Sequence, residues 1–444
     1  MHNDTERKLT ALCKAPIKDP ETLYYLVRRY MSVKDTLAYF RNDESAIELI
    51  DKKISREILK LSEAEQNRFR QDYQIASILE KMDKRGLPID VNALRLCCNN
   101  AFEAYCDAYQ YLNTICKERG FELQDNFFRS NRTFTGNNVP LNIPLGEARK
   151  LWKHTTILDM DKLASYIKHL SDGSDRLYCK WVNNASVTGR IQTVQPNIQG
   201  FPKAVRKACF KPSAGNVLIS GDYESEELVI MAIIADDKQL LHDILSGTDL
   251  HRIVAADLYK KQPEAVTEEE RSTAKRISFA TLYGAGCSAL EGMAKSGRCK
   301  QYDGSIIANI VKARYPAINV LEKKIEREGV IRYIDGSTID IRDVLKKYSR
   351  VNRLIQTSAS IILKEVVLEL DRFLPADASI VCLIHDEIIV ECPENLSHVC
   401  KDILEKTMSQ VNKKFGKSYE LPVKVEVTKG DKNEKIRNNE SDCK

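Results

Sequence analysis

The sequence predicts an α+β fold, in which a small antiparallel sheet is surrounded by long helices. Residues 217–221 form a short apolar run that leads into a helical pattern at 224–235. The runs 379–384 and 388–391 flank a polar turn, as the two strands of a hairpin do. Strands and helices are thus segregated, which is typical of the α+β class. Helical spacing dominates two further segments, 236–348 and 351–373.

Size and charge balance indicate an ordinary soluble globular protein. The 444 residues are 43% hydrophobic, enough for a large core and about three domains or subdomains. The 68 basic and 63 acidic residues leave a net charge of only +5, so any nucleic-acid surface would be a local cationic stripe. The tail at 429–444 is polar, and we expect it to fray.

The cysteines and the N-terminal residues indicate a reducing compartment. Thirteen cysteines are scattered in apolar helical contexts, as at Cys106 and Cys116, and neither a CxxC pattern nor a His/Cys cluster has zinc-ligand spacing. The neighbours Cys97 and Cys98 are most simply core or boundary residues. The first residues lack a signal-peptide core, and no apolar window approaches the length of a membrane helix. We expect reduced thiols, no structural zinc and a cytoplasmic, membrane-free location.

Three predicted regions precede the apolar run at 217–221. Residues 1–72 have the pattern of short, charged amphipathic helices, too little for a catalytic domain. Residues 73–119 predict two long helices packed in antiparallel fashion. The stretch 126–146 is rich in Gly, Pro, Asn and Ser, which predicts a loop. Basic residues around it are equally consistent with phosphate contacts and with a solvated loop: Arg129, Arg132, Arg149, Lys150 and Lys153.

Three acidic residues stand where apolar runs end. Asp222 follows the first predicted strand, and Asp386 and Glu387 lie in the turn of the hairpin. Taken alone, Asp222 is readily explained as a helix N-cap and the other two as turn residues. Carboxylates at such strand ends can also share a pair of divalent metals, which align and neutralise the oxygens of an in-line phosphoryl displacement.

A cationic and aromatic stripe lies between these acids in the sequence. Arg271, Lys275, Phe279 and Tyr283 are spaced four residues apart. On a helix this spacing drifts by only about 40° per step, so the four side chains line one face about 18 Å long. The cations could grip a triphosphate while the aromatic rings meet a sugar and a base. The alternative is an amphipathic helix with two snorkelling cations and two core aromatics.

Taken together, these segments resemble the A, B and C motifs of the family-A DNA polymerases, the class of bacterial DNA polymerase I and related phage enzymes. The run from Asp222 to Leu228 resembles the first motif, 271–284 the second, and His385-Asp386-Glu387 the third. Thr188-Gly189-Arg190 and the PNIQ run at 196–199 resemble a further signature of the family. The likeness covers roughly residues 73–435 in the family's order.

The resemblance implies a role for each matching residue. Asp222, Asp386 and the backbone carbonyl of Tyr223 would bind two Mg²⁺ ions, for which Mn²⁺ can substitute, with Glu387 as a weaker catalytic acid beside them. The cations that would neutralise the nucleotide phosphates are Arg271, Lys275 and His251, with Lys275 also counted as catalytic.

The remaining implied roles concern the sugar, the bases and the DNA. Glu227 would close the pocket beneath the sugar and exclude a 2′-hydroxyl, while Phe279 packs on the incoming nucleotide and Tyr283 stacks near the templating base. Contacts to the minor groove or backbone of the nascent pair would test its shape without reading its sequence. The residues that match these positions are Arg190, Asn197, Gln199, Asn352, Gln356 and His385.

Several positions depart from the family's pattern. Glu224-Ser225-Glu226 stands where Ser-Gln-Ile is typical, and Val229 replaces a common Arg. Ser278 and Ala280 stand where Asn and Gly are frequent, and Thr357 where Gly is usual. None of these removes a metal ligand or a phosphate cation. They bear on contacts to the primer terminus, and therefore on fidelity and processivity.

The resemblance implies a right-hand polymerase fold with a palm built on an antiparallel sheet. We expect a helical thumb at 73–184, a palm at 185–235 and 345–444, and helical fingers at 236–344. The implied activity is template-directed addition of deoxynucleotides to a primer 3′ end, in replication or repair. Residues 1–72 are too short and lack the strand pattern for an exonuclease domain, so we expect no 3′-5′ proofreading.

The expected partners are primer-template DNA and deoxynucleoside triphosphates. A separate processivity or proofreading protein could assist the chain. We expect a monomer that is nucleoid-associated or encoded by a phage or another mobile element. Two rivals remain. One is a DNA-binding protein that has lost catalysis, which the intact Asp222, Asp386, Arg271 and Lys275 argue against. The other is a ribonucleotide polymerase or a primase-like enzyme, which Glu227 argues against.

Overall fold

The computed structural model describes residues 2–13, 26–27, 36, 39–40, 43–118, 157–170, 173–297, 303–344, 346 and 349–430. The predicted basic loop at 126–146 and most of the predicted polar tail, from residue 431, lie outside these ranges. Within them, no helix combines the length and apolar character that a membrane crossing requires.

The N-terminal helices form a small unit with its own core. They are α1 (His2–Cys13), α4 (Glu44–Ile58) and α5 (Glu63–Arg85), and α1 packs against both of the others. Leu9, Ile50 and Ile54 are fully buried between them. A capping box between Ser62 and Glu65 starts α5, which then runs without interruption through the predicted boundary at residue 72.

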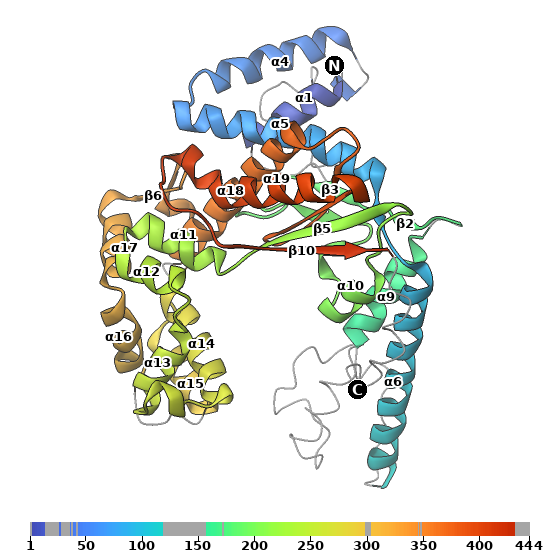
Figure 1. Ribbon diagram of the computed structural model, residues 1–444. Coiled ribbons are helices and arrows are strands. Elements are labelled where there is room, and N and C mark those ends of the chain that lie inside the picture. The colour runs from blue at the N-terminus through green and yellow to red at the C-terminus, as the bar shows by residue number, and fades with distance from the viewer. Residues whose placement is uncertain are drawn as a thin grey trace.

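The predicted antiparallel pairing of two long helices is wrong. Both helices exist, as α5 and α6 (Val91–Glu118), but α5 crosses above the sheet and α6 projects away below it (Figure 1). α5 packs against α1 and against α18 (Ser349–Phe373), whereas α6 packs against α9 (Ile157–Lys168) and α10 (Lys203–Cys209). The polar residues Gln71 and Asp72 on α5 look solvent-facing in the sequence, yet they are buried against α18.

The central sheet confirms the predicted strands and adds one. Its antiparallel order is β10-β5-β9-β8, and β10 was not predicted although it alternates in the pattern VKVEVTK. The bounds are β5 Asn216–Tyr223, β8 Ser379–Ile384, β9 Glu387–Pro393 and β10 Val423–Lys429.

One face of this sheet is covered closely by α19 (Ser397–Gln410). A Cβ atom added at Gly221 would lie 2.6 Å from Met408 Sδ, so only glycine admits this approach. The Tyr223 hydroxyl donates to the Met408 carbonyl oxygen on the same face, at 2.9 Å. Because side chains alternate along a strand, Asp222 projects from the opposite face, away from α19.

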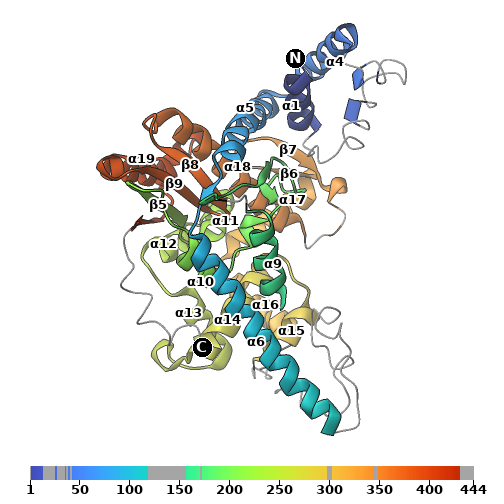
Figure 2. The same cartoon turned by 90° about the vertical axis from the view of Figure 1, so that its right-hand side faces the viewer.

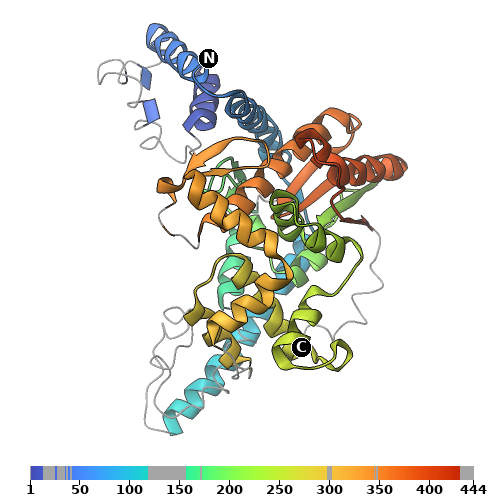
Figure 3. The same ribbon diagram turned by 90° about the vertical axis from the view of Figure 1, so that its left-hand side faces the viewer.

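The region predicted to be mostly helical is so, with one exception. The short antiparallel hairpin of β6 (Val330–Arg332) and β7 (Thr338–Asp340) was not predicted. Figure 3 looks onto this helical group, with α16 and α17 nearest to the viewer. The helices are α11 Glu226–Ala235, α12 Lys238–Leu245, α13 Leu250–Tyr259, α14 Glu268–Leu282, α15 Cys287–Ser296, α16 Gly304–Arg314 and α17 Pro316–Glu328.

Two groups of helices project from the same side of the sheet, and the N-terminal unit lies on the other (Figures 1 and 2). One projecting group contains α13 to α16, and the other contains α6, α9 and α10. The remaining strands form two-stranded antiparallel pairs: β1 Leu87–Pro88 with β2 Arg176–Leu177, and β3 Lys180–Val182 with β4 Gln192–Val194. Short 3-10 helices complete the described chain: Ile198–Gly200, Pro263–Ala265, Ile341–Asp343, Glu394–Leu396 and Val411–Phe415.

Candidate active site

The sheet brings the predicted carboxylates to one end of two neighbouring strands. Asp222 on β5 is the cross-strand partner of Glu387 on β9. Ile384 also pairs with Glu387, so only His385 and Asp386 form the hairpin connection. His385 takes a left-handed backbone with φ 59°, which closes this turn. Asp222 and Asp386, 164 positions apart in the sequence, therefore emerge beside one another.

The alternative of a helix cap for Asp222 is excluded. Asp222 lies within β5, and the N-cap of the following helix α11 is Ser225. Asp222 is partly exposed and forms no ion pair with any described residue. Its position suits a ligand or a substrate contact better than a structural role.

Burial and like charge destabilise the ionised acids. Burial, followed by the charges of Asp386 and Glu387, raises the pKa of Asp222 to about 6. Burial is also the main cause of the raised pKa of Asp386. Such a pair is stabilised by a cation. In the described part of the chain no three His, Cys, Asp or Glu side chains gather as metal ligands. Two neighbouring carboxylates could hold a divalent ion, with water and other oxygens completing its coordination.

Glu387 is engaged differently from the two aspartates. Its carboxylate accepts from Arg206 Nη1 and from Ser220 Oγ, both at 2.5 Å. Arg206 and Lys203 on α10 also oppose the rise in the pKa of Asp222. These cations were missed, although basic residues at 203, 206 and 207 have the spacing of one helix face.

Helix α14 carries the predicted cationic and aromatic stripe. Arg271 Nε donates to Asp249 Oδ2 at 2.6 Å, so this predicted phosphate ligand is already paired. Lys275 is exposed and has no ion-pair partner among the described residues. The rings of Phe279 and Tyr283 stack at 6.1 Å with an interplanar angle of 14°.

His251 on α13 packs beside this stripe. Its ring centre lies 5.5 Å from that of Phe279, and its buried Nδ1 has no hydrogen-bond partner. Burial, together with the charges of Lys275 and Arg271, lowers the pKa of His251 to about 4. Without a bound anion His251 is therefore neutral near pH 7, and the positive charge of this face belongs to Lys275 and Arg271.

Glu227 connects the two sides of the site. One carboxylate oxygen accepts from Arg190 Nη2 at 3.0 Å, and the other accepts from the Tyr283 hydroxyl. Tyr283 caps the C-terminal end of α14, whereas Glu227 lies in the first turn of α11 at the end of β5. This contact fixes the end of the stripe beside the carboxylates of the sheet.

A cavity of about 530 Å³ gathers most of the predicted DNA-contacting residues. Gln199 also donates to the Leu383 carbonyl oxygen at 3.0 Å, which anchors it to β8. Asn352 and Gln356 do not line the cavity; they lie on α18, one to two turns before the Ala359 that does. The lining residues used below are Arg190, Asn197, Gln199, Glu226, Glu227, His385 and Asp386.

Arg190 is held by a loop that rests on buried groups. Gly189 takes φ 77°, a conformation that glycine adopts without strain, and its carbonyl oxygen accepts from Ser360 Oγ at 2.6 Å. At the start of the loop, Asn184 Oδ1 accepts from the buried Lys364 Nζ at 2.8 Å. The guanidinium therefore projects from a backbone that α18 fixes at both ends.

Comparison with known proteins identifies the family. A protein-family model, described as DNA polymerase family A, matches residues 135–435 of the sequence, which is more than half of the chain. This chain belongs to DNA polymerase family A. DNA polymerase I of Aquifex aeolicus is 32% identical over 296 residues, which are 63% of this chain and 49% of the relative. DNA polymerase I of Lactococcus lactis subsp. lactis is 24% identical over 455 residues, covering 90% of this chain and 50% of the relative.

A solved structure confirms the fold. The polymerase domain of Pol1 from M. smegmatis, in complex with DNA primer-template and dNTP, superimposes with a TM-score of 0.77 at 17% identity. The match covers 96% of this chain and 81% of that structure. The family-A chain thus has the predicted α+β, right-hand polymerase fold. It spans about half the length of the two bacterial relatives.

Glu226 is a site residue that the sequence reasoning did not assign. It occupies the position where the family-A pattern has an apolar residue, and it lines the cavity while being only 7% exposed. Its Oε1 has no hydrogen-bond partner. Burial, then the charges of Asp386 and Glu227, raise the pKa of Glu226 to about 8. The departure from the family pattern was the available signal.

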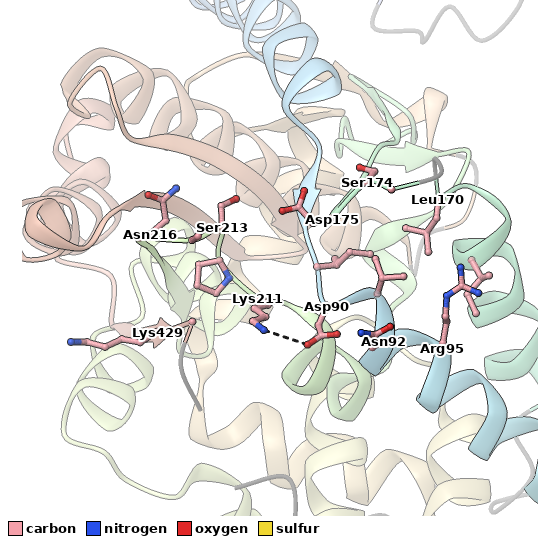
Figure 4. A pocket seen from close by; sticks show the side chains of 18 of the residues that line it. Asp90, Asn92, Arg95, Leu170, Ser174, Asp175, Lys211, Ser213, Asn216 and Lys429 are labelled. Atoms are coloured by element: carbon pink, nitrogen blue, oxygen red, sulfur yellow. Dashed lines mark ion pairs between the residues drawn. The ribbon is translucent and has the colours of Figure 1, made fainter. Parts of the chain in front are cut away.

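A larger cavity, about 930 Å³, lies at the opposite end of the sheet from this site (Figure 4). It is lined by the start of α6, the loop at 211–216 and the ends of β9 and β10. Charges of both signs face it, including the Lys211 and Asp90 pair at 3.6 Å. It contains none of the predicted site residues, so volume alone is a poor guide to the chemistry of this family-A chain.

Proposed function

We propose that this chain is a DNA-directed DNA polymerase that adds deoxynucleotides to a primer 3′ end. The observation that carries the proposal is the convergence of Asp222 and Asp386 at one end of the sheet, beside a cationic helix face anchored through Glu227 and Tyr283. Family membership and the M. smegmatis structure, a complex with DNA primer-template and dNTP, support the same substrates.

Asp222 and Asp386 would hold the divalent ions, with the backbone carbonyl of Tyr223 as a further oxygen ligand. Mg²⁺ suits this all-oxygen donor set, and Mn²⁺ can substitute. When bound, two such ions stabilise both the attacking and the leaving oxygens of an in-line displacement. Glu387 acts through Arg206 and Ser220 by fixing the strand end on which the aspartates stand.

The helix α14 face binds the nucleotide. Lys275 is unpaired and meets the triphosphate directly, whereas Arg271 first exchanges Asp249 for a phosphate oxygen. His251 donates a hydrogen bond to the phosphates rather than adding charge. Phe279 packs on the incoming base, Tyr283 stacks near the templating base, and Glu227 closes the space beneath the sugar. Movement of this face onto the triphosphate gates the step.

The DNA lies along the cavity. Arg190, Asn197, Gln199 and His385 donate hydrogen bonds to the minor-groove acceptors of the nascent pair, which are alike in every correct pair. Asn352 and Gln356 extend the same path along α18. In this proposal the thumb is 73–184, the fingers are 236–344, and the palm is 185–235 with 345–444. The role is replication or repair without proofreading.

The decisive experiment replaces one carboxylate. Asp386→Asn should lower primer extension by about 10³-fold or more, because it removes a metal ligand, while primer-template affinity stays within a few-fold. Extension is followed on a labelled primer, and affinity by fluorescence anisotropy. The matched control is Asp377→Asn, an exposed acid in the turn before β8. Loss of affinity in step with activity would make Asp386 a structural acid and contradict the proposal.

Two comparisons separate the rival functions. Extension by the unmodified chain excludes a binding protein without catalysis. A ribonucleotide polymerase would use ATP and dATP equally, whereas we expect strong preference for dATP. Glu227→Ala should raise the use of ATP relative to dATP by at least about tenfold, because it opens space for the 2′-hydroxyl. An unchanged ratio would assign sugar selection to another residue.

A further inference from the structure

Glu226 is an acidic residue at a buried position, where a carboxyl group without a partner is unfavourable. It is the first residue of α11 and only 7% exposed, and its Oε1 lacks a hydrogen-bond partner. Leaving a buried carboxyl oxygen without a partner is unfavourable unless a ligand supplies the missing group. Because Glu226 lines the cavity together with Arg190, His385 and Asp386, a substrate bound in that cavity is in position to supply the missing group.

The surroundings restrict the chemistry of that group. Arg190, Asn197 and Gln199 offer hydrogen-bond donors, which suit the N3 and O2 acceptors of the minor groove. An acid among them pairs with a donor, either the guanine amino group or a sugar hydroxyl. A hydroxyl donates to a carboxylate and accepts from a carboxylic acid, so it pairs with Glu226 in either form. The guanine amino group only donates, and it is present in only some base pairs.

A divalent cation is a weaker explanation. No three acidic, His or Cys side chains in the described ranges gather as ligands, so Glu226 does not complete a metal site with Asp222 and Asp386. The neighbouring Glu227 is also no partner, since both of its oxygens are occupied by Arg190 and Tyr283. A sugar hydroxyl is the remaining candidate.

The position of Glu226 indicates which sugar is involved. Glu227 lies beneath the incoming sugar and leaves no room there for a 2′-hydroxyl. Glu226 lines the same cavity as Asp386, which in the proposed function holds the ions that stabilise the attacking oxygen of the primer 3′ end. The 2′ and 3′ hydroxyls of a ribose stand on adjacent carbons. We propose that Glu226 binds the 2′-hydroxyl of a ribonucleotide at the primer terminus, so that RNA-terminated primers are substrates of this chain.

The inference rests on the proposed function. It is tested by the ratio of extension rates for a ribonucleotide-terminated and a deoxyribonucleotide-terminated primer. Two primers differ only in a terminal ribonucleotide or deoxyribonucleotide, and kcat/KM is measured for addition of one dNTP to each. Glu226→Ile, the residue type of the family pattern, should lower the ratio of ribo-terminated to deoxy-terminated extension by about tenfold, the effect of one lost hydrogen bond. Glu226→Gln keeps an acceptor and a donor and should retain the ratio within about threefold. The exposed Glu224→Gln is the matched control, with an unchanged ratio.

The outcomes separate the subsite from the activity. A fall in the ratio for Glu226→Ile alone supports the inference. An equal loss on both primers, or an unchanged ratio, overturns the subsite while the polymerase function stands. If Glu226→Ile changes only the use of ATP against dATP, the partner is the incoming sugar and the inference is overturned. If the unmodified chain extends neither primer, the proposed function fails and the subsite fails with it.

Discussion

At the scale of single residues, the site is organised by which charges are already paired. Arg271 is held by Asp249 and Glu387 by Arg206, whereas Lys275 and Asp222 form no ion pair with described residues. Charged groups that lack partners are free to meet substrate or metal without first breaking a contact. The nucleotide and its metal ions would therefore be received first by Lys275 and Asp222, and the exchange at Arg271 would follow.

His251 offers a direct test of this electrostatic arrangement. Because burial and the charges of Lys275 and Arg271 lower its pKa to about 4, its ring should stay neutral between about pH 6 and 8. Proton NMR of the His251 ring, assigned by its absence in His251→Gln, should show a titration midpoint near 4. In Lys275→Met the midpoint should rise, because a repelling charge is lost.

The sign of the linked stability change follows from proton binding. Between the folded value, near 4, and the unfolded value of 6.5, the unfolded chain binds more protons at His251. The contribution of His251 to stability is therefore lost as the pH falls through this window. A midpoint above 6 would mean that the ring is solvated and that His251 carries charge to the phosphates after all.

The sequence predicted residue types at the site far better than their partners. Asp222, Asp386, Arg190 and Glu227 could be predicted because each sits in a short motif. Asp249 and Arg206 could not, because their importance depends on which group from a distant segment lies opposite. Arg206 and Glu387 are 181 positions apart, and no local pattern records such a pairing.

At the scale of elements, apolar runs in the sequence correctly predicted three strands of the sheet. The polar residues on one face of α5 led to a wrong prediction of how that helix packs. The strands β5, β8 and β9 are buried, so their sequences are nearly continuous apolar runs. β10 lies at the sheet edge and alternates with charged residues, which hid it. The face of α5 against α18 carries the buried polar residues Gln71 and Asp72, and a polar buried face has no signature in hydrophobic periodicity.

The buried ion pair between α5 and α18 should be essential for stability. Lys364 Nζ lies 2.6 Å from Asp72 Oδ1, and both side chains are almost fully excluded from solvent. Removing one partner leaves a buried charge, at a cost of about 3–5 kcal/mol. Asp72→Ala should therefore lower the thermal midpoint by about 3–5 °C, measured by circular dichroism.

Two variants control this prediction. The double variant Asp72→Leu with Lys364→Met removes both charges and should recover most of the lost midpoint. Asp371→Asn breaks the solvent-exposed pair with Lys81 on the same two helices, and it should cost less than about 1 kcal/mol. Equal effects of Asp72→Ala and Asp371→Asn would show that the buried pair contributes nothing special.

At the scale of the whole molecule, the right-hand architecture consists of one small sheet with helices on both sides of it. One four-stranded sheet supplies the fixed acids, and two groups of helices rise from the same side of it (Figure 2). The described N-terminal helices α1 and α4 lie on the other side and have a small separate core. They contribute no side chain to the site at Asp222 and Asp386.

The proposed function without proofreading predicts that the chain does not shorten a primer. The described residues before the end of α5 are helical and carry no strand on which nuclease carboxylates could stand. A labelled primer with a mismatched 3′ end, incubated with Mg²⁺ and no nucleotides, should remain full length.

Inorganic pyrophosphatase is added as a control, because pyrophosphate would let a polymerase shorten a primer by reversing its own reaction. Addition of dNTPs to the same sample shows that the enzyme is active. Shortening that persists in Asp386→Asn would reveal a nuclease centre separate from the sheet and contradict the prediction, whereas shortening that disappears would belong to the polymerase site itself.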